Sequence, residues 1–132
     1  MENQFIPYEQ ALELKALGFN EGCIASYTDT LIFDVLEQNG IMWHTVTNEK
    51  LKEYEKACTV PLYQQAFRWF REKYGIVAEI GINYYTSERK YGYKLYFLKE
   101  KSHSASYPYH HLNFEEAELA CLKKLIEIVK NK

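Results

Sequence analysis

Residues 59–75, with the sequence TVPLYQQAFRWFREKYG, constrain the fold more than any other stretch of the chain. At about 100° per residue, their apolar side chains fall on one arc roughly 160° wide. Polar side chains such as Gln64, Arg68 and Arg71 fill the opposite side. The arc consists of Leu62, Tyr63, Ala66, Phe67, Trp69, Phe70 and Tyr74. The pattern predicts an amphipathic helix that lies across the core of the protein.

Both ends of this segment carry signals that agree with a helix. The Thr59 hydroxyl can cap the first turn, and Pro61 is tolerated there because its missing N–H has no partner inside the helix. Gly75 supplies the left-handed residue that commonly ends a helix. Burial of Phe67 and Phe70 would contribute on the order of 1.5–3 kcal/mol each.

Two further helices are expected near the ends of the chain. Residues 7–17 begin with a proline and stop at Gly18, and residues 113–132 carry a continuous apolar face. Asn113 and Glu116 resemble a capping box at the start of the second of these helices.

Hairpin patterns fill the space between the helices. Apolar runs at 22–27, 31–36 and 41–46, separated by turn residues 28–30 and 38–40, predict a three-stranded meander. Residues 48–56 read as a short helical turn or an exposed connector. Alternation over 76–85 and 90–98 predicts two strands joined by a loop at 86–89. Residues 99–112 lack periodicity and are interpreted as a surface loop or a disordered connection.

These elements define the fold class. We expect one α+β domain over residues 1–132, with three helices over one face of a mostly antiparallel sheet of about five strands. The expected order is α-β-β-β-α-β-β-α. Strand order and oligomeric state stay open.

Composition limits the classes of function. The net charge is −2 and the pI is about 6.1, which disfavours a strong non-specific nucleic-acid binder. Three separated cysteines without a C-x-x-C motif indicate reduced thiols, and the first residues lack the features of a secretory signal. No apolar run is long enough to cross a bilayer. We therefore expect a cytoplasmic protein without membrane contact.

Three blocks of the sequence resemble a group of known proteins. They are PYEQALELKALGF at 7–19, PLYQQAFRWFREKYG at 61–75 and EEAELACLKKLIEIVK at 115–130, about a third of the chain. Together they resemble small uncharacterised proteins of Bacteroides-type bacteria and of their bacteriophages and prophages. The resemblance implies a bacterial or phage source, and it assigns no site residue.

Catalytic and metal-binding patterns are weak. His110 and His111 are expected to diverge on an extended backbone, so no metal site is predicted. Cys58 at a helix start is the one candidate for a reactive thiolate. The signatures of common hydrolases and nucleotide-binding enzymes do not occur. We expect a protein that is not an enzyme and has no cofactor.

An excess of tyrosine, 12 in all, points to contact surfaces. Tyrosine and tryptophan are enriched at interface hot spots, so a protein partner is the first hypothesis. Residues 89–96 also resemble the base-stacking strand of an RNA-binding RRM domain, which makes single-stranded nucleic acid the alternative partner. The candidate interaction residues are Tyr85, Arg89, Lys90, Tyr91, Tyr93, Lys94, Tyr107 and Tyr109. Whether a helix covers the face of Tyr91 and Tyr93 decides between a binding surface and core packing.

Overall fold

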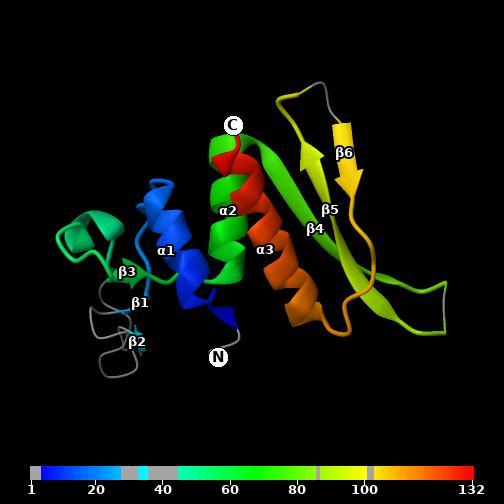
Figure 1. Cartoon of the computed structure of the whole chain (residues 1–132), viewed down its shortest axis with the longest axis horizontal. Coiled ribbons are helices and arrows are strands. Elements are labelled where there is room, and N and C mark those ends of the chain that lie inside the picture. Colours follow the sequence, from blue (N-terminus) through cyan, green and yellow to red (C-terminus); the bar gives the residue numbers. More distant parts are fainter. Residues whose placement is uncertain (1–3, 28–32, 36–44, 86, 101–102) are drawn as a thin grey trace. The chain divides into compact units, whose positions relative to one another are not determined.

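A computed structural model describes residues 4–27, 33–35, 45–85, 87–100 and 103–132. The elements in order are α1 (Tyr8–Ala16), β1 (Ala25–Tyr27), β2 (Phe33–Val35), η2 (Asn48–Leu51), β3 (Cys58–Thr59), α2 (Tyr63–Tyr74), β4 (Ile76–Asn83), β5 (Lys90–Phe97), β6 (His103–Ser106) and α3 (Phe114–Lys130). They confirm the predicted α+β class and its antiparallel pairing (Figure 1). The chain forms two compact units, Met1–Leu62 and Tyr63–Lys132. The single domain stays a prediction.

The first unit, Met1–Leu62, contains a small sheet in the order β2-β1-β3. β1 pairs with β2 through Ser26 and Asp34, and with β3 through Ser26 and Thr59. α1 packs on β3. Helix α1 lies within the predicted range 7–17, and Gly18 with a φ of 96° ends it. The predicted meander is confirmed for 25–27 and 33–35, while its two turns lie outside the described residues.

Two buried or part-buried polar side chains hold this unit together. The Asn48 amide donates to the Phe19 carbonyl at 2.7 Å and accepts from the Thr59 N–H at 2.9 Å. Lys15 Nζ donates to the carbonyls of Leu51, Tyr54 and Ala57 at 3.1, 2.9 and 2.6 Å. The bonds of Lys15 satisfy carbonyls at the end of η2 and in the segment that follows it. The 3-10 helix η2 confirms the short helical turn expected within 48–56.

The third predicted strand of the meander, 41–46, lies mostly outside the described residues. Its last residue, Val46, makes an isolated antiparallel bridge with Cys23 through bonds of 2.8 and 2.9 Å. The described partner of β1 on this side is instead β3, which the sequence pattern did not reveal. Two residues are too short for a visible alternation.

The second unit, Tyr63–Lys132, contains a sheet in the order β4-β5-β6 with all strands antiparallel. α2 packs on β4 and on α3, while α3 packs on β4 and β5. Figure 1 shows both helices on the same side of this sheet. The described strands therefore form two three-stranded sheets, whereas one sheet was expected.

Helix α2 begins later than predicted. It starts at Tyr63 instead of near Thr59, which lies in β3 with a hydroxyl that has no hydrogen-bond partner in the described part of the chain. The predicted Thr59 cap is therefore wrong. Pro61 explains the shift, because a residue before proline avoids the helical region and Val60 continues the extended chain. The predicted stop is confirmed, since Gly75 has a φ of 68°.

The aromatic arc of α2 is mostly core. Tyr63, Trp69 and Phe70 are buried, and the Trp69 ring meets the Phe70 ring edge-on at 5.1 Å. Phe67, which was expected to share that burial, is only half-buried.

The predicted loop 99–112 contains a strand. β6 pairs with β5 from Lys94–Ser106 to Phe97–His103, and the His103 ring stacks on the Phe97 ring at 4.6 Å. The four residues His-Ser-Ala-Ser lack the branched and large apolar side chains typical of strands, so the pattern concealed it. Pairing with the open edge of β5 stabilises it instead.

Helix α3 begins as predicted. The Asn113 side chain accepts from the Glu116 N–H at 2.8 Å, and Glu116 Oε2 accepts from the Leu112 N–H at 3.1 Å. This is a reciprocal cap of the kind expected for Asn113 and Glu116.

Candidate protein-binding surface

Two tyrosines of β5, Tyr91 and Tyr93, lie on the helix-covered face of the sheet. Tyr93 is 7% exposed, and burial raises its pKa to about 12, with smaller contributions from Cys121, Tyr107 and Glu127. Tyr91 is half-buried, and its ring meets the Phe114 ring of α3 at 6.2 Å. Helix α3 therefore covers the face of Tyr91 and Tyr93, which favours core packing over a binding surface there. Tyr93 is a core residue and not the exposed interaction residue that was expected.

The cations of the same strand point the other way. Alternation along β5 places Lys90 and Lys94 on the opposite face from Tyr91 and Tyr93. Lys90 Nζ pairs with Glu88 at 3.4 Å, and Arg89 is exposed. The stretch 89–96 therefore does not assemble its rings and cations on one side, as an RRM strand would require.

Tyr109 lies across two glycines on the face opposite the helices. A Cβ atom at Gly92 would come within 2.6 Å of Tyr109 Cγ, and one at Gly81 within 3.2 Å of Tyr109 Oη. Gly81 and Gly92 are direct cross-strand partners, so one ring fills the space that two missing side chains leave. Tyr109 is half-buried and is in the first place a structural residue.

Tyr107 packs in a third way. Its ring stacks on the Tyr93 ring at 4.7 Å, and Lys124 Nζ of α3 lies 5.6 Å from its centre. Of the predicted interaction residues, Tyr85 and Arg89 are exposed, while Lys90, Tyr91, Lys94, Tyr107 and Tyr109 are half-buried.

The exposed apolar side chains of this unit gather mainly at one end of the sheet. Tyr84 and Tyr85, which directly follow β4, are 72% and 99% exposed, and Leu112 and Phe114 are 70% and 42% exposed. Tyr91 lies between the two pairs along the sheet, because it is opposite Ile82 on β4, bridges His111 and contacts Phe114. We call Tyr84, Tyr85, Tyr91, Leu112 and Phe114 the hairpin-end surface. Figure 1 shows that the closing end of the β4–β5 hairpin projects away from α3.

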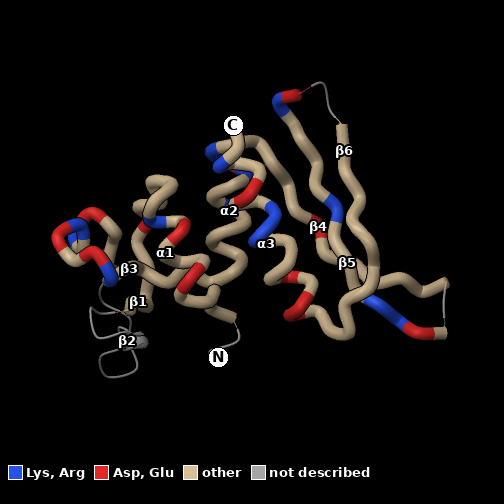
Figure 2. Tube along the Cα trace, in the orientation of Figure 1, with Lys and Arg blue, Asp and Glu red and all other residues tan. Residues whose placement is uncertain are grey.

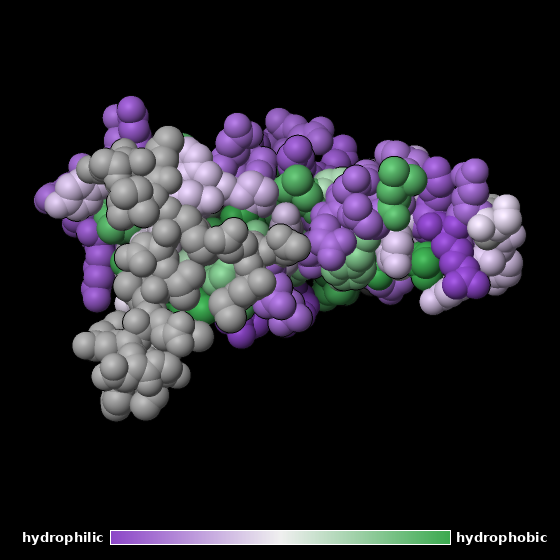
Figure 3. All heavy atoms as spheres, turned by 90° about the horizontal axis from the view of Figure 1, so that it is seen from below, coloured by the Kyte–Doolittle hydropathy of each residue, from purple (hydrophilic) through white to green (hydrophobic). Residues whose placement is uncertain are grey.

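Charged residues border this surface. Glu115 and Glu116 lie in the first turn of α3, and Glu88, Arg89 and Lys90 lie where the hairpin closes (Figure 2). Figure 3 shows apolar atoms left open between polar side chains in the part of the chain that holds this sheet. An apolar centre with a charged border is the usual composition of a protein interface.

Three members of the hairpin-end surface were missed as site residues. Tyr84 was counted as part of the predicted strand 76–85 and Phe114 as part of the apolar face of the last helix, while Leu112 was placed in a loop. Their position in the chain could have identified them as exposed. Each lies just beyond the end of a strand or at the start of a helix, where the opposite layer no longer covers it.

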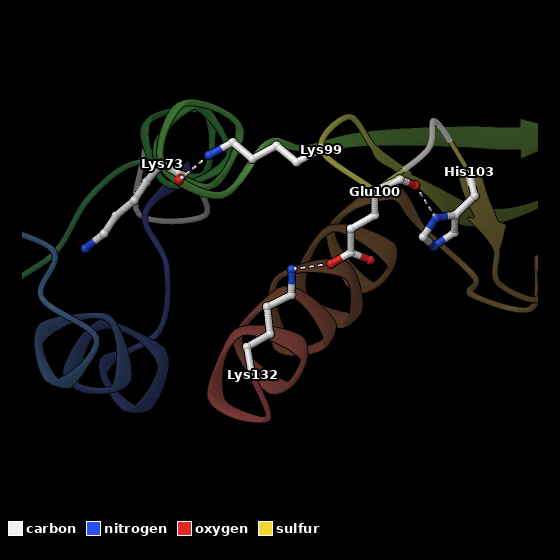
Figure 4. A network of polar contacts seen from close by, with 5 residues as sticks. All are labelled: Lys73, Lys99, Glu100, His103 and Lys132. Atoms are coloured by element: carbon white, nitrogen blue, oxygen red, sulfur yellow. Dashed lines mark hydrogen bonds and ion pairs between the residues drawn. The ribbon is translucent and has the colours of Figure 1, made fainter.

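The opposite end of the unit holds a polar network, drawn in Figure 4. Lys99 Nζ donates to the Lys73 carbonyl at 3.1 Å, Lys132 Nζ pairs with Glu100 at 3.0 Å, and the His103 ring contacts the Glu100 carbonyl at 2.9 Å. The hydrogen bond from Lys132 lowers the pKa of Glu100. Lys73 and Lys132 lie at the C-terminal ends of α2 and α3, where cations complement the helix dipole. This network has a structural explanation and needs no ligand.

The chemical hypotheses find little support. Cys58 lies in β3 and not at a helix start, and burial raises the pKa of its thiol to about 11. The rings of His110 and His111 do not diverge as expected, since their centres are 4.2 Å apart. Within the described ranges, no three His, Cys, Asp or Glu side chains are grouped to hold a metal ion.

No family model matches this chain, and neither a curated protein nor a solved structure matches it. None of the helices in the described part is long and apolar enough to span a bilayer. The resemblance to proteins of Bacteroides-type bacteria and their phages stays a prediction.

Proposed function

We propose that this chain is a non-enzymatic binding protein that recognises a protein partner through the hairpin-end surface. The observation that supports this proposal most is the exposure of Tyr84, Tyr85, Leu112 and Phe114 at one end of one sheet. Large apolar side chains scattered singly over a surface need no explanation, but a group of them marks an interaction site.

The two tyrosines suit this role for a physical reason. A tyrosine ring offers a large contact area with few rotatable bonds, so little conformational entropy is lost when a partner covers it. The Tyr85 side chain is almost fully exposed, so a change there should leave the fold intact. The bacterial or phage source and the cytoplasmic location belong to the same proposal and rest on the sequence alone.

The partner can be sought by photo-crosslinking from position 85. A chain with a photoreactive phenylalanine in place of Tyr85 is expected to form one main crosslinked species in a lysate of the source cells. Tyr54 provides the matched control, because it is 50% exposed but lies in the other unit. Leu112→Asp should abolish the crosslink from position 85.

Affinity measurements with the captured protein complete the test. Tyr85→Ala should weaken binding by about 2 kcal/mol, roughly thirtyfold, if Tyr85 is a hot spot. Tyr54→Ala should leave the affinity unchanged. Equal crosslinking from positions 54 and 85, or a crosslink that Leu112→Asp does not reduce, would refute the proposal.

A second candidate partner is single-stranded nucleic acid, on the face opposite the helices. Lys90, Lys94, Tyr96 and Tyr109 share that face, although the carboxylate of Glu79 accepts a hydrogen bond from Tyr96 there at 3.3 Å. Fluorescence anisotropy with short single-stranded RNA and DNA at low salt tests this candidate. Binding that salt weakens and Lys94→Glu abolishes would favour it over the protein partner.

A further inference from the structure

We propose that β4 pairs with β4 of a second copy of this chain, which joins two sheets into one six-stranded antiparallel sheet. This inference does not depend on the hairpin-end surface. It rests on the edge of β4, its backbone hydrogen bonds and its charge pattern.

β4 is an edge strand of eight residues. The sheet order is β4-β5-β6, and no described strand pairs with the other side of β4. Edge strands of this length are usually protected by proline, by several charges or by a bulge. β4 has one charged residue, Glu79, and no proline. Its eight pairs with β5 run in continuous register without a bulge.

The hydrogen-bond alternation shows which residues face the open edge. The Leu98 N–H donates to the Gly75 carbonyl at 2.8 Å, so Gly75 and Leu98 are a hydrogen-bonded pair in line with the register. Antiparallel pairs alternate, which directs the N–H and C=O groups of Val77, Glu79 and Gly81 toward β5. The same groups of Ala78, Ile80 and Ile82 therefore point to the open edge.

The side chains of these three residues are incompletely covered. They lie on the face that packs on α2 and α3, yet all three are half-buried, whereas Leu95 and Phe97 on the same face of β5 are buried. An added strand would bury this apolar surface and bind the free backbone groups together.

The sequence of β4 fits a second copy of itself in one register. The apolar faces of the two sheets lie on the same side only if even-numbered residues of one copy pair with even-numbered residues of the other. Two registers of this kind pair seven residues of β4 with seven residues of the second β4. One places Glu79 opposite Glu79 of the second copy, which is destabilising. The other places Ile80 opposite Ile80, Ala78 opposite Ile82 and Glu79 opposite Gly81. This register avoids repulsion and provides two backbone bonds for each of three hydrogen-bonded pairs.

Two measurements on the intact chain test the pairing. Amide hydrogen exchange is monitored by NMR, and the mass of the particle is determined by sedimentation. At high protein concentration the mass should double, and the amides of Ala78, Ile80 and Ile82 should become protected. On dilution these three amides should lose protection, while those of Val77, Glu79 and Gly81 should keep it because they bond to β5.

Two variants separate edge pairing from other association. Ala78→Pro removes an N–H that faces the edge and leaves every β5 bond in place, so the variant should stay folded and monomeric. Glu79→Gln should leave the dimer unchanged in the proposed register, and a tighter dimer would instead identify the register that opposes the two Glu79 side chains. A monomer at every concentration, or a dimer in which the Ala78, Ile80 and Ile82 amides exchange fast, would overturn the proposal. The exchange pattern of the unchanged chain decides the matter even if Ala78→Pro fails to fold.

Discussion

The contact between Tyr109 and Gly92 allows a quantitative test of the fold of the second unit. A Cβ atom at residue 92 would lie 2.6 Å from Tyr109 Cγ and 2.8 Å from Cε1. Cγ is bound directly to the stem of the side chain, so the ring cannot avoid the new methyl group by a small movement of its tip. Gly92→Ala should therefore displace the whole ring and cost about 1–3 kcal/mol, as overpacking does.

The same substitution should have the opposite effect once the ring is absent. In a Tyr109→Ala background, alanine replaces glycine in a strand with free space beside it, which should stabilise the protein by about 0.5–1 kcal/mol. The two substitutions should thus couple by about 1.5–4 kcal/mol. Gly81→Ala is the control, because its Cβ atom would lie 3.2 Å from the Tyr109 hydroxyl at the movable end of the side chain.

Urea denaturation of the four proteins of this cycle, followed by circular dichroism, measures the coupling. The expected order has Gly92→Ala less stable than the unchanged chain, and the double variant more stable than Tyr109→Ala alone. If Gly92→Ala costs the same in both backgrounds, the ring does not lie on Gly92 in solution and the reasoning is wrong.

Three further predictions concern the cores and one carboxylate. Phe70→Ala should cost about 3–5 kcal/mol of unfolding free energy because Phe70 is fully buried, while Phe67→Ala should cost less because Phe67 is half-buried; equal losses in urea denaturation would contradict the burial. Asn48→Ala should cost about 2–4 kcal/mol because it removes two buried hydrogen bonds, whereas Lys52→Ala, in an exposed ion pair, should leave the free energy of unfolding nearly unchanged. Burial, and to a smaller extent the charge of Glu115, raises the pKa of Glu118 from 4.5 to about 7. The contribution of protonated Glu118 to stability is therefore complete below pH 4.5 and lost as the pH rises through about 7. Glu118→Gln should flatten that part of the stability profile, and an unchanged profile would show that the pKa of Glu118 is not raised.

The helices could be predicted because chemical signals mark their ends. Gly18 and Gly75 adopt positive φ where stops were expected, and Asn113 caps α3 as its sequence suggested. The start of α2 could not be predicted from its own residues. Thr59 is drawn into β3 by pairing with Ser26, which lies 33 positions earlier in the chain, so a tertiary contact overrides a local signal.

The candidate surface was predictable only in part. Alternation correctly placed Tyr91 and Tyr93 on one face of β5, but periodicity cannot say on which face the helices pack. Exposure at the hairpin end depends on where α3 begins relative to the end of the sheet, and no residue pattern encodes that distance. Tyr85 was identified, whereas Leu112 and Phe114 became visible only with α3 in place.

The central position of β5 limits how its gene segment can change length. Even-numbered residues of β5 bond to β4 and odd-numbered ones to β6, as the Tyr107 N–H to the Tyr93 carbonyl shows. One inserted or deleted residue within Lys90–Phe97 would therefore exchange both sets of bonds at once and turn Lys94 toward α3. Length changes around β5 should accordingly fall in the connections that flank it, and the connection to β4 is where Tyr84 and Tyr85 lie. Related chains that differ in length there would differ in their binding surface while keeping the same sheet.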